Sequence, residues 1–327
     1  MSGPVTRPQS GETRRRTATA PAKVNLHLGV GPRRADGLHG IVTVYQSVGL
    51  WTHVTMTAEP ESGTGTVTFS GPSTYVERGD EDLVRAAVRR CFETAGRPEE
   101  AVRVDIDSDI PVRGGMGSGA ANAAASIVAA NALFGLGLSP AQELGVAQSL
   151  GSDVPLCLHG GTMLGIGHGE QVTPMPWRGD PLHWVVAMAR EGLGAESVFA
   201  ELDRMRGAGT AHPSASFDAE DQPVDDGHID LARALAGGDV DEIAANLYND
   251  LANAVASLRP AIRRTLEDGR EAGALAAVIA GSGPTCLLLC RDGASALDVA
   301  TELATRGSAH AVRAITGPTR GAHITAT

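Results

Sequence analysis

A single ammonium group stands out among the residues that could do chemistry. Of the 27 lysine and arginine residues in this chain, only Lys23 is a lysine. Codon bias in a GC-rich genome would replace lysine by arginine almost everywhere. The one remaining lysine is then either a chance exception or a residue whose ammonium group the site requires. An ammonium is a compact point charge whose pKa shifts readily, whereas a guanidinium is a wide fork that stays charged. On the chemical interpretation, position 23 needs the smaller group.

A glycine-rich segment is the second chemical feature. Gly114, Gly115, Gly117 and Gly119 lie within six positions, directly before an alanine-rich helical segment. Glycine lets the backbone approach a ligand closely, and the start of a helix offers unpaired N–H groups with a positive partial charge. This pattern predicts a phosphate-binding loop. The alternative is a tight strand-to-helix turn that needs glycine for its geometry alone.

Three common nucleotide-binding motifs can be tested against this loop. A Walker A loop requires a lysine, and none follows position 23; protein-kinase HRD and DFG elements are also absent. A dinucleotide fold is harder to dismiss, because Gly115, Gly117 and Ala120 match its G-x-G-x-x-A variant. However, no acidic residue for the ribose occurs between Asp109 and Glu143, so the dinucleotide interpretation is disfavoured.

The elements that must position these residues begin with strands. The segment KVNLHLGV alternates apolar and polar residues, and GIVTVYQSVGL, THVTMTAEP and AVRVDIDSDIPV also look like strands. Helical spacing follows in EDLVRAAVRRCFETAG and in SPAQELGVAQSLG, where Ser139 and Gln142 form a capping box. Strands clustered before helices favour an α+β fold over a doubly wound parallel sheet.

Two polar segments are expected to lie outside the packed lobes. Residues 1–18 contain an arginine run and lack the hydrophobic segment of a signal peptide, so we expect a disordered tail. Residues 207–228 are acidic and poor in large apolar side chains, which is typical of a mobile loop.

The composition limits the classes of partner. The net charge of −11 argues against a general affinity for nucleic acid or for an anionic membrane surface, and no apolar run is long enough for a membrane span. The cysteines Cys91, Cys157, Cys286 and Cys290 form no C-x-x-C pair and lack zinc-site spacing. They indicate reduced thiols in a cytoplasmic protein. The oligomeric state stays open, with a homodimer as one possibility.

Three segments, in order along the chain, carry a family likeness. PAKVNLHL, IPVRGGMGSGAANAAA and AGSGPT resemble the three motifs of the GHMP small-molecule kinases. More narrowly, APAKVNLHLGV…RRADGLHGIVTVYQSV and GSDVPLCLHGG…GHGE are similar to the members that phosphorylate the 2-hydroxyl of a cytidyl diphosphate sugar alcohol in the non-mevalonate isoprenoid pathway. The likeness extends from about residue 20 to residue 317.

This resemblance implies a fold and a reaction. The expected fold is the two-lobed α+β GHMP kinase fold, with a ribosomal-S5-like N-terminal domain over 19–176 and a ferredoxin-like C-terminal domain over 177–327. The active site would lie between the two domains. The expected reaction is transfer of the γ-phosphoryl group of ATP to a small-molecule alcohol, with Mg²⁺ carried by the nucleotide.

The resemblance also implies roles for individual residues. Lys23 and Asp153 match the family's catalytic pair, in which a carboxylate accepts the proton of the hydroxyl and an ammonium stabilises the developing charge. Asp153 has an alternative role as the N-cap of a helix near Pro155. Asn25, which leaves its strand on the same face as Lys23, matches a residue that binds the substrate, although a buried, internally bonded asparagine is the plain alternative. Three aromatic residues also match substrate-binding positions, namely His39, Tyr45 and Phe199.

The expected nucleotide site combines the glycine loop, a residue near the adenine and the third motif. These residues are Asp82, Pro111, Val112, Arg113, Gly114, Gly115, Met116, Gly117, Ser118, Gly119, Ala120, Ala121, Asn122, Gly281, Ser282 and Gly283.

Three features depart from the family pattern. Ala120 and Ala121 replace a serine-containing pair, which removes a hydroxyl that Ser118 could replace. Leu38 stands where a tyrosine is usual, and Asp82 where asparagine is common. These departures keep two alternatives open, namely another GHMP kinase of the homoserine or mevalonate type, and a non-catalytic nucleotide-binding relative.

Overall fold

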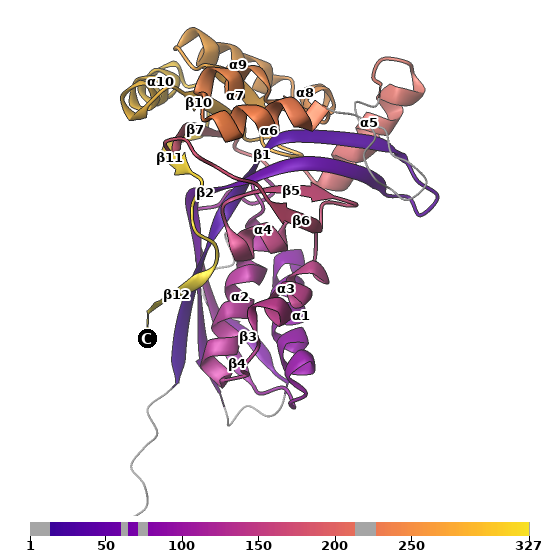
Figure 1. Ribbon diagram of the computed structural model, residues 1–327, viewed down its shortest axis with the longest axis vertical. Helices are drawn as coiled ribbons and strands as arrows, with labels where there is room; N and C mark the ends of the chain where they lie inside the picture. Colours follow the sequence, from indigo (N-terminus) through magenta and orange to yellow (C-terminus); the bar gives the residue numbers. More distant parts are fainter. Residues whose placement is uncertain (1–13, 60–64, 71–77, 213–226, 327) are drawn as a thin grey trace, which may run out of the picture.

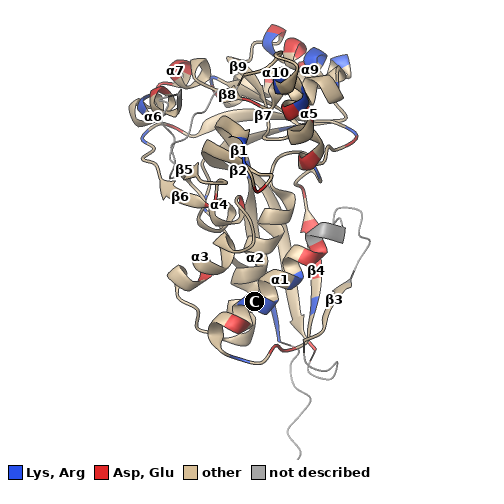
Figure 2. Cartoon of the chain, turned by 90° about the vertical axis from the view of Figure 1, so that its right-hand side faces the viewer, with Lys and Arg blue, Asp and Glu red and all other residues tan. Residues whose placement is uncertain are grey.

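The computed structural model describes residues 14–59, 65–70, 78–212 and 227–326 (Figure 1). Among these residues the strands form two sheets, one of eight strands and one of four. No helix in the described ranges is both long and apolar enough to cross a membrane. Charged residues of both signs are spread over the helices of both lobes (Figure 2).

The larger sheet belongs to the first lobe. Its main strand order is β12-β1-β2-β4-β3, with β5 paired to β2 and β6, and β8 paired to β1. The bounds of its strands are β1 (Arg15–Arg33), β2 (His39–Ala58), β3 (Val67–Ser70), β4 (Val102–Ser108), β5 (Thr162–Ile166), β6 (Gln171–Pro174), β8 (Tyr248–Asn249) and β12 (His323–Ala326).

Strands β1 and β2 form a long antiparallel hairpin that extends from the first lobe beneath the second (Figure 1). Its register shifts after Pro21 and again between Asn25 and His27. Proline cannot donate to a strand ladder, and such irregularities bend a strand and re-aim its side chains. Lys23 lies between the two irregularities, where the hairpin passes from one lobe to the other.

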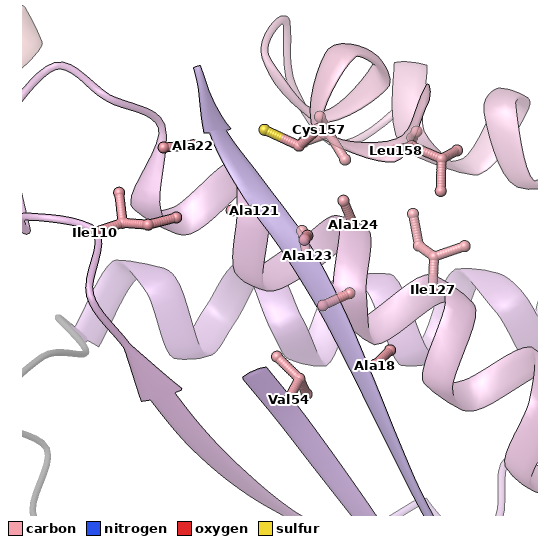
Figure 3. Close-up of a cluster of buried hydrophobic side chains, with 14 of the residues drawn as sticks. Ala18, Ala22, Val54, Ile110, Ala121, Ala123, Ala124, Ile127, Cys157 and Leu158 are labelled. Carbon is pink, nitrogen blue, oxygen red and sulfur yellow. The ribbon is translucent and has the colours of Figure 1, made fainter. Parts of the chain in front are cut away.

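Four helices accompany the first sheet, namely α1 (Arg78–Ala95), α2 (Ser118–Phe134), α3 (Pro140–Gln148) and α4 (Val154–His159). Helix α2 packs against β1 and β2 through small side chains such as Ala123 and Ala124, which lie in the same buried cluster as Ala18 and Val54 (Figure 3). Alanine adds little bulk, so the helix can lie close to the sheet. This packing brings the glycine loop before α2 onto β1.

The smaller sheet contains β7 (Leu182–Met188), β9 (Ala276–Ile279), β10 (Cys286–Cys290) and β11 (Ala311–Gly317), in the order β11-β7-β10-β9. All its pairs are antiparallel. The helices of this part of the chain are α5 (Ala195–Gly207), α6 (Gly227–Gly237), α7 (Val240–Ala245), α8 (Ala252–Leu258), α9 (Ala261–Glu271) and α10 (Gly293–Arg306). With helices between its first two and its last two strands, this is the ferredoxin-like arrangement. The predicted α+β fold of two lobes is therefore confirmed.

Two predicted boundaries need correction. The predicted tail, 1–18, lies mostly outside the described residues, but its last residues are strand, because Arg15 already pairs with Thr57 of β2. The polar side chains of this segment gave no sign of a strand, because strand pairing depends on backbone hydrogen bonds and not on side-chain type. The last strand of the predicted second domain, 177–327, belongs to the first lobe instead, because β12 pairs with β1 in the first sheet. The predicted division at 176/177 falls in the connection between β6 and β7, and most of the predicted loop 207–228 lies outside the described residues.

Candidate active site

Lys23 and Asp153 form an ion pair between the two lobes. Nζ of Lys23, on β1, lies 3.1 Å from Oδ2 of Asp153, directly before α4. The lysine side chain is 7% exposed and the aspartate side chain 26%, so the carboxylate is the member of the pair that solvent or a ligand can reach. The backbone N–H of Lys23 donates to the carbonyl of Met116 at 3.0 Å, which attaches the glycine loop to the same strand.

Asp153 occupies the N-cap position of α4, but its side chain makes no capping hydrogen bond. Its carboxylate faces Lys23 instead. The capping role that the sequence left open therefore does not explain this residue.

Asn25 connects Lys23 to the sheet. Its Oδ1 accepts from Nζ of Lys23 at 2.9 Å, and its Nδ2 donates to Oγ1 of Thr43 at 2.9 Å. Thr43 in turn donates to the carbonyl of His27 at 2.7 Å. This buried chain orients the ammonium. Because the side chain of Asn25 is engaged within the protein, its predicted contact with the substrate stays a prediction.

Tyr45 lies beneath the ion pair. Its ring is 5.8 Å from Nζ of Lys23, and its hydroxyl interacts with the Asp153 carboxylate. Burial raises the pKa of Tyr45 well above its ordinary value, and the neighbouring Asp153 carboxylate raises this pKa further. The hydroxyl therefore stays protonated and can donate to the carboxylate. Tyr45 lies in a buried cluster with Leu156 and Met163, and its predicted contact with the substrate stays a prediction.

The glycine loop and the third motif interlock across the two lobes. Gly115 has a φ of 81°, and a Cβ at this position would lie 1.8 Å from the carbonyl oxygen of Ala280. Gly281 has a φ of 46°, and its Cβ would lie 3.1 Å from Nζ of Lys23. Only glycine combines these backbone angles with such close approach. The conformational need for glycine and the predicted ligand cradle therefore apply to the same loop.

A cavity of about 230 Å³ opens in front of the ion pair. It is lined by Lys23, Pro111, Val112, Arg113, Gly114, Gly115, Gly117, Ser118, Gly119, Asp153, Leu193, Ala195 and Ser282. The first turn of α2 carries no acidic side chain, and within the described part of the chain the buried Oγ of Ser118 has no hydrogen-bond partner. An unpaired hydroxyl and a helix N-terminus beside two cationic side chains suit the oxygens of a phosphate group.

The remaining residues predicted for the nucleotide site do not line this cavity. They are Asp82, Met116, Ala120, Ala121, Asn122, Gly281 and Gly283. Asn122 is buried, and its Oδ1 accepts from Oγ1 of Thr52 at 2.7 Å. Asp82 lies near the start of α1. The predicted roles of these residues stay predictions.

A second cavity, of about 470 Å³, is lined by residues of β1, β2 and the turn between them, by residues of α5 and by His168. The rings of His39 and Phe199 stack at its wall, with centroids 5.2 Å apart and planes inclined by 27°. Leu38, which stands in place of the family's tyrosine, is 54% exposed and lines the same cavity. An apolar wall with a stacked ring pair suits a flat heterocycle.

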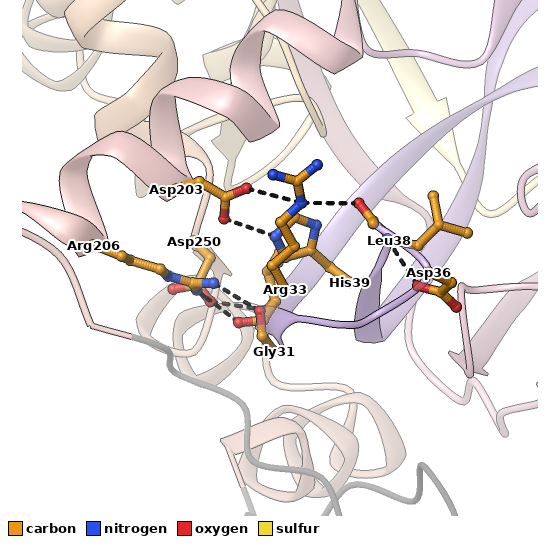
Figure 4. Close-up of polar contacts among 10 residues, drawn as sticks. Gly31, Arg33, Asp36, Leu38, His39, Asp203, Arg206 and Asp250 are labelled. Carbon is orange, nitrogen blue, oxygen red and sulfur yellow. Dashed lines mark hydrogen bonds and ion pairs between the residues drawn. The ribbon is translucent and has the colours of Figure 1, made fainter.

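Sequence reasoning missed two charged residues at this second cavity. Asp203 lies 2.9 Å from Nε2 of His39 and 3.8 Å from Nε of Arg33 (Figure 4). A usable signal was present, because Asp203 follows Phe199 by four residues and α5 therefore presents both side chains on one face.

Comparison with known proteins agrees with this architecture. The family model "GHMP kinases N terminal domain" matches residues 82–161, and "GHMP kinases C terminal" matches residues 231–309. A relative from Nocardia farcinica, named 4-diphosphocytidyl-2-C-methyl-D-erythritol kinase, is 44% identical over 306 residues, which cover 93% of this chain and 94% of the relative. A relative of the same name from Rhodococcus jostii is 44% identical over 307 residues, covering 93% of each chain.

Solved structures show the same fold. A crystal structure of 4-(cytidine 5'-diphospho)-2C-methyl-D-erythritol kinase matches with a TM-score of 0.69 and 26% identity, covering 92% of this chain and 98% of that one. A homoserine kinase from Cytophaga hutchinsonii matches with a TM-score of 0.72 at 18% identity, covering 98% of this chain and 100% of that one, which supports the fold alone. The chain belongs to the GHMP kinase family.

Proposed function

We propose that this protein is an ATP-dependent kinase that phosphorylates the 2-hydroxyl of 4-diphosphocytidyl-2-C-methyl-D-erythritol, a step of the non-mevalonate isoprenoid pathway. The single observation that carries the proposal is the 3.1 Å pair of Lys23 and Asp153 in front of the glycine-loop cavity. The curated relatives, 41–44% identical over most of the chain, carry the name of this enzyme.

The pair supplies what a tertiary alcohol needs for phosphoryl transfer. The Asp153 carboxylate accepts the hydroxyl proton as the alcohol oxygen bonds to the γ-phosphorus and the bond from that phosphorus to the β-phosphate oxygen breaks. The bonding electrons leave with ADP. The Lys23 ammonium stabilises the carboxylate before the transfer and the developing negative charge on oxygen during it. Asn25 and Tyr45 hold the pair in place from within the protein.

The nucleotide phosphates fit the 230 Å³ cavity, with Arg113 and the first turn of α2 as the other favourable charges. Mg²⁺ would enter with the nucleotide and neutralise phosphate charge. The residues present fit such a group, because Ser118 and Asp153 line the same cavity and the Oγ of Ser118 is buried without a partner among the described residues.

The second cavity favours an acceptor that carries a base. A small acceptor such as homoserine or mevalonate has no flat ring to place against His39 and Phe199, whereas a cytidyl group does. The presence of both Lys23 and Asp153 argues against a non-catalytic nucleotide-binding relative.

The test is ADP release from the purified protein with Mg·ATP and a panel of acceptors. The expected result is release with 4-diphosphocytidyl-2-C-methyl-D-erythritol and none with homoserine or mevalonate. The matched control is Asp153→Asn, which keeps the size of the side chain but removes its charge. ADP release with homoserine or mevalonate, or failure to release ADP with any acceptor in the panel, would overturn the proposed substrate.

A further inference from the structure

The contact between Asp203 and His39 joins two segments that lie far apart in the chain. Asp203 on α5 places Oδ1 2.9 Å from Nε2 of His39, which lies 164 positions earlier at the start of β2. The other carboxylate oxygen lies 3.8 Å from Nε of Arg33 at the end of β1. The His39 side chain is 6% exposed and that of Asp203 26% (Figure 4).

Helix α5 is attached to β1 close to this contact. Arg206, one turn beyond Asp203, donates to the carbonyls of Val30 and Gly31 at 2.7 Å each. It also pairs with the buried Asp250 at 3.4 Å. The helix is thus tied to β1 at the same end that carries Asp203, and the carboxylate holds the His39 ring against Phe199.

The chemistry of this contact determines where His39 carries its proton. An ionised carboxylate only accepts hydrogen bonds, so Nε2 must donate to it. In the neutral ring, Nδ1 is then the nitrogen without a proton and can only accept. An accepting nitrogen complements an amino group and is repelled by a carbonyl oxygen. Cytosine presents an amino group at its 4-position, whereas uracil presents a carbonyl there.

We propose that Asp203 is a positioning residue that sets base specificity in the acceptor cavity. By fixing the orientation of His39 and its Nε2–H form, Asp203 makes the cavity prefer a pyrimidine with a 4-amino group over one with a 4-carbonyl group. This inference rests on the proposed function, because it assigns the second cavity to the base of the acceptor. The residue acts through His39.

The experiment titrates CMP and UMP, as probes of the base cavity, into the full-length protein and three variants. Wild type is expected to bind CMP more tightly than UMP. Asp203→Ala should lose about tenfold in CMP affinity with little change for UMP, because the ring is freed and its proton can move to Nδ1. Asp203→Asn keeps an oxygen that accepts from Nε2–H and should restore most of the preference. Glu201→Gln, a carboxylate change on the same helix at a residue that bonds Arg204 and Ser257, is the matched control and should behave as wild type.

Steady-state kinetics separate positioning from general damage. Asp203→Ala should raise KM for the cytidyl acceptor about tenfold and leave kcat and the KM for ATP within twofold. If wild type prefers CMP but Asp203→Ala keeps the full preference, the role of Asp203 is wrong and the proposed function stands. If wild type binds neither nucleotide and phosphorylates no cytidyl acceptor, the proposed function itself fails. A parallel loss of kcat and of ATP affinity in Asp203→Ala would also overturn the inference.

Discussion

The backbone at Gly115 lies directly against the carbonyl oxygen of Ala280. A side chain at 115 would begin 1.8 Å from that oxygen and 2.6 Å from the amide nitrogen of Gly283. These residues belong to motifs that lie 165 positions apart and come from different lobes. The contact places Gly281 beside Lys23, so one glycine helps to hold the nucleotide loop, the third motif and the catalytic ammonium together.

We predict that Gly115→Ala destabilises the protein by about 2 kcal/mol or more and lowers kcat/KM for ATP at least tenfold, because the loop must move off Ala280. Urea unfolding and initial rates measure the two effects. The matched control is Gly145→Ala in α3, where a Cβ has no atom within 4 Å and the backbone is helical. That change should stabilise the protein by about 0.5–1 kcal/mol and leave the rates unchanged. Wild-type rates in Gly115→Ala would contradict the assigned contact.

Lys23→Met keeps the length of the side chain and removes its charge. We expect kcat to fall by a factor on the order of 10² to 10³, because no other group replaces the ammonium beside Asp153 among the described residues. Lys23→Arg should lose a similar factor, since the wider guanidinium cannot take the place of the compact ammonium between Asn25 and Asp153. Single-turnover rates with saturating substrates measure the chemical step. A near-normal single-turnover rate in Lys23→Met would show that Lys23 has another role.

Ser118→Ala removes a buried hydroxyl that has no partner in the described structure. We expect KM for ATP to rise about tenfold while the free energy of unfolding stays the same or increases slightly, because the hydroxyl makes no internal hydrogen bond. Ser126→Ala in the same helix is the control. Its Oγ donates to the carbonyl of Asn122 at 2.7 Å, so its loss should affect stability rather than KM. The opposite pattern would exclude a phosphate contact at Ser118.

The buried thiols predict an alkaline loss of stability. Burial raises the pKa of Cys286 to about 12, whereas an exposed thiol titrates near 9. The folded-state pKa is the higher one, so this stability is fully present below pH 9 and is lost as pH rises toward 12. Above pH 9, one such thiol lowers the free energy of unfolding by up to about 1.4 kcal/mol per pH unit. Urea unfolding under reducing conditions between pH 8 and 10.5 should show a shallower decline in Cys286→Ala than in wild type. Equal slopes would mean that the thiol ionises freely in the folded protein.

The sequence by itself determined the local features of this protein. A lone lysine on an alternating strand, a glycine cluster before an alanine-rich helix and a capping box at Ser139 each depend on neighbouring residues. The structure has each of these elements, including the bond from the Gln142 amide to the Ser139 side chain. Motif order along the chain was enough to indicate the family, and with it the α+β fold of two lobes.

Only the tertiary structure decided which distant residues meet. From the sequence, Asp153 had two roles open to it, an N-cap role suggested by the helix near Pro155 and a catalytic role implied by the family resemblance. The packing of α4 against β1 settled its contact by placing the carboxylate 3.1 Å from Lys23. The contact of Asp203 with His39 and the pairing of β12 with β1 likewise depend on how distant elements pack together. Short-range patterns record the conformational preferences of neighbouring residues, whereas these contacts depend on how whole elements pack across the chain.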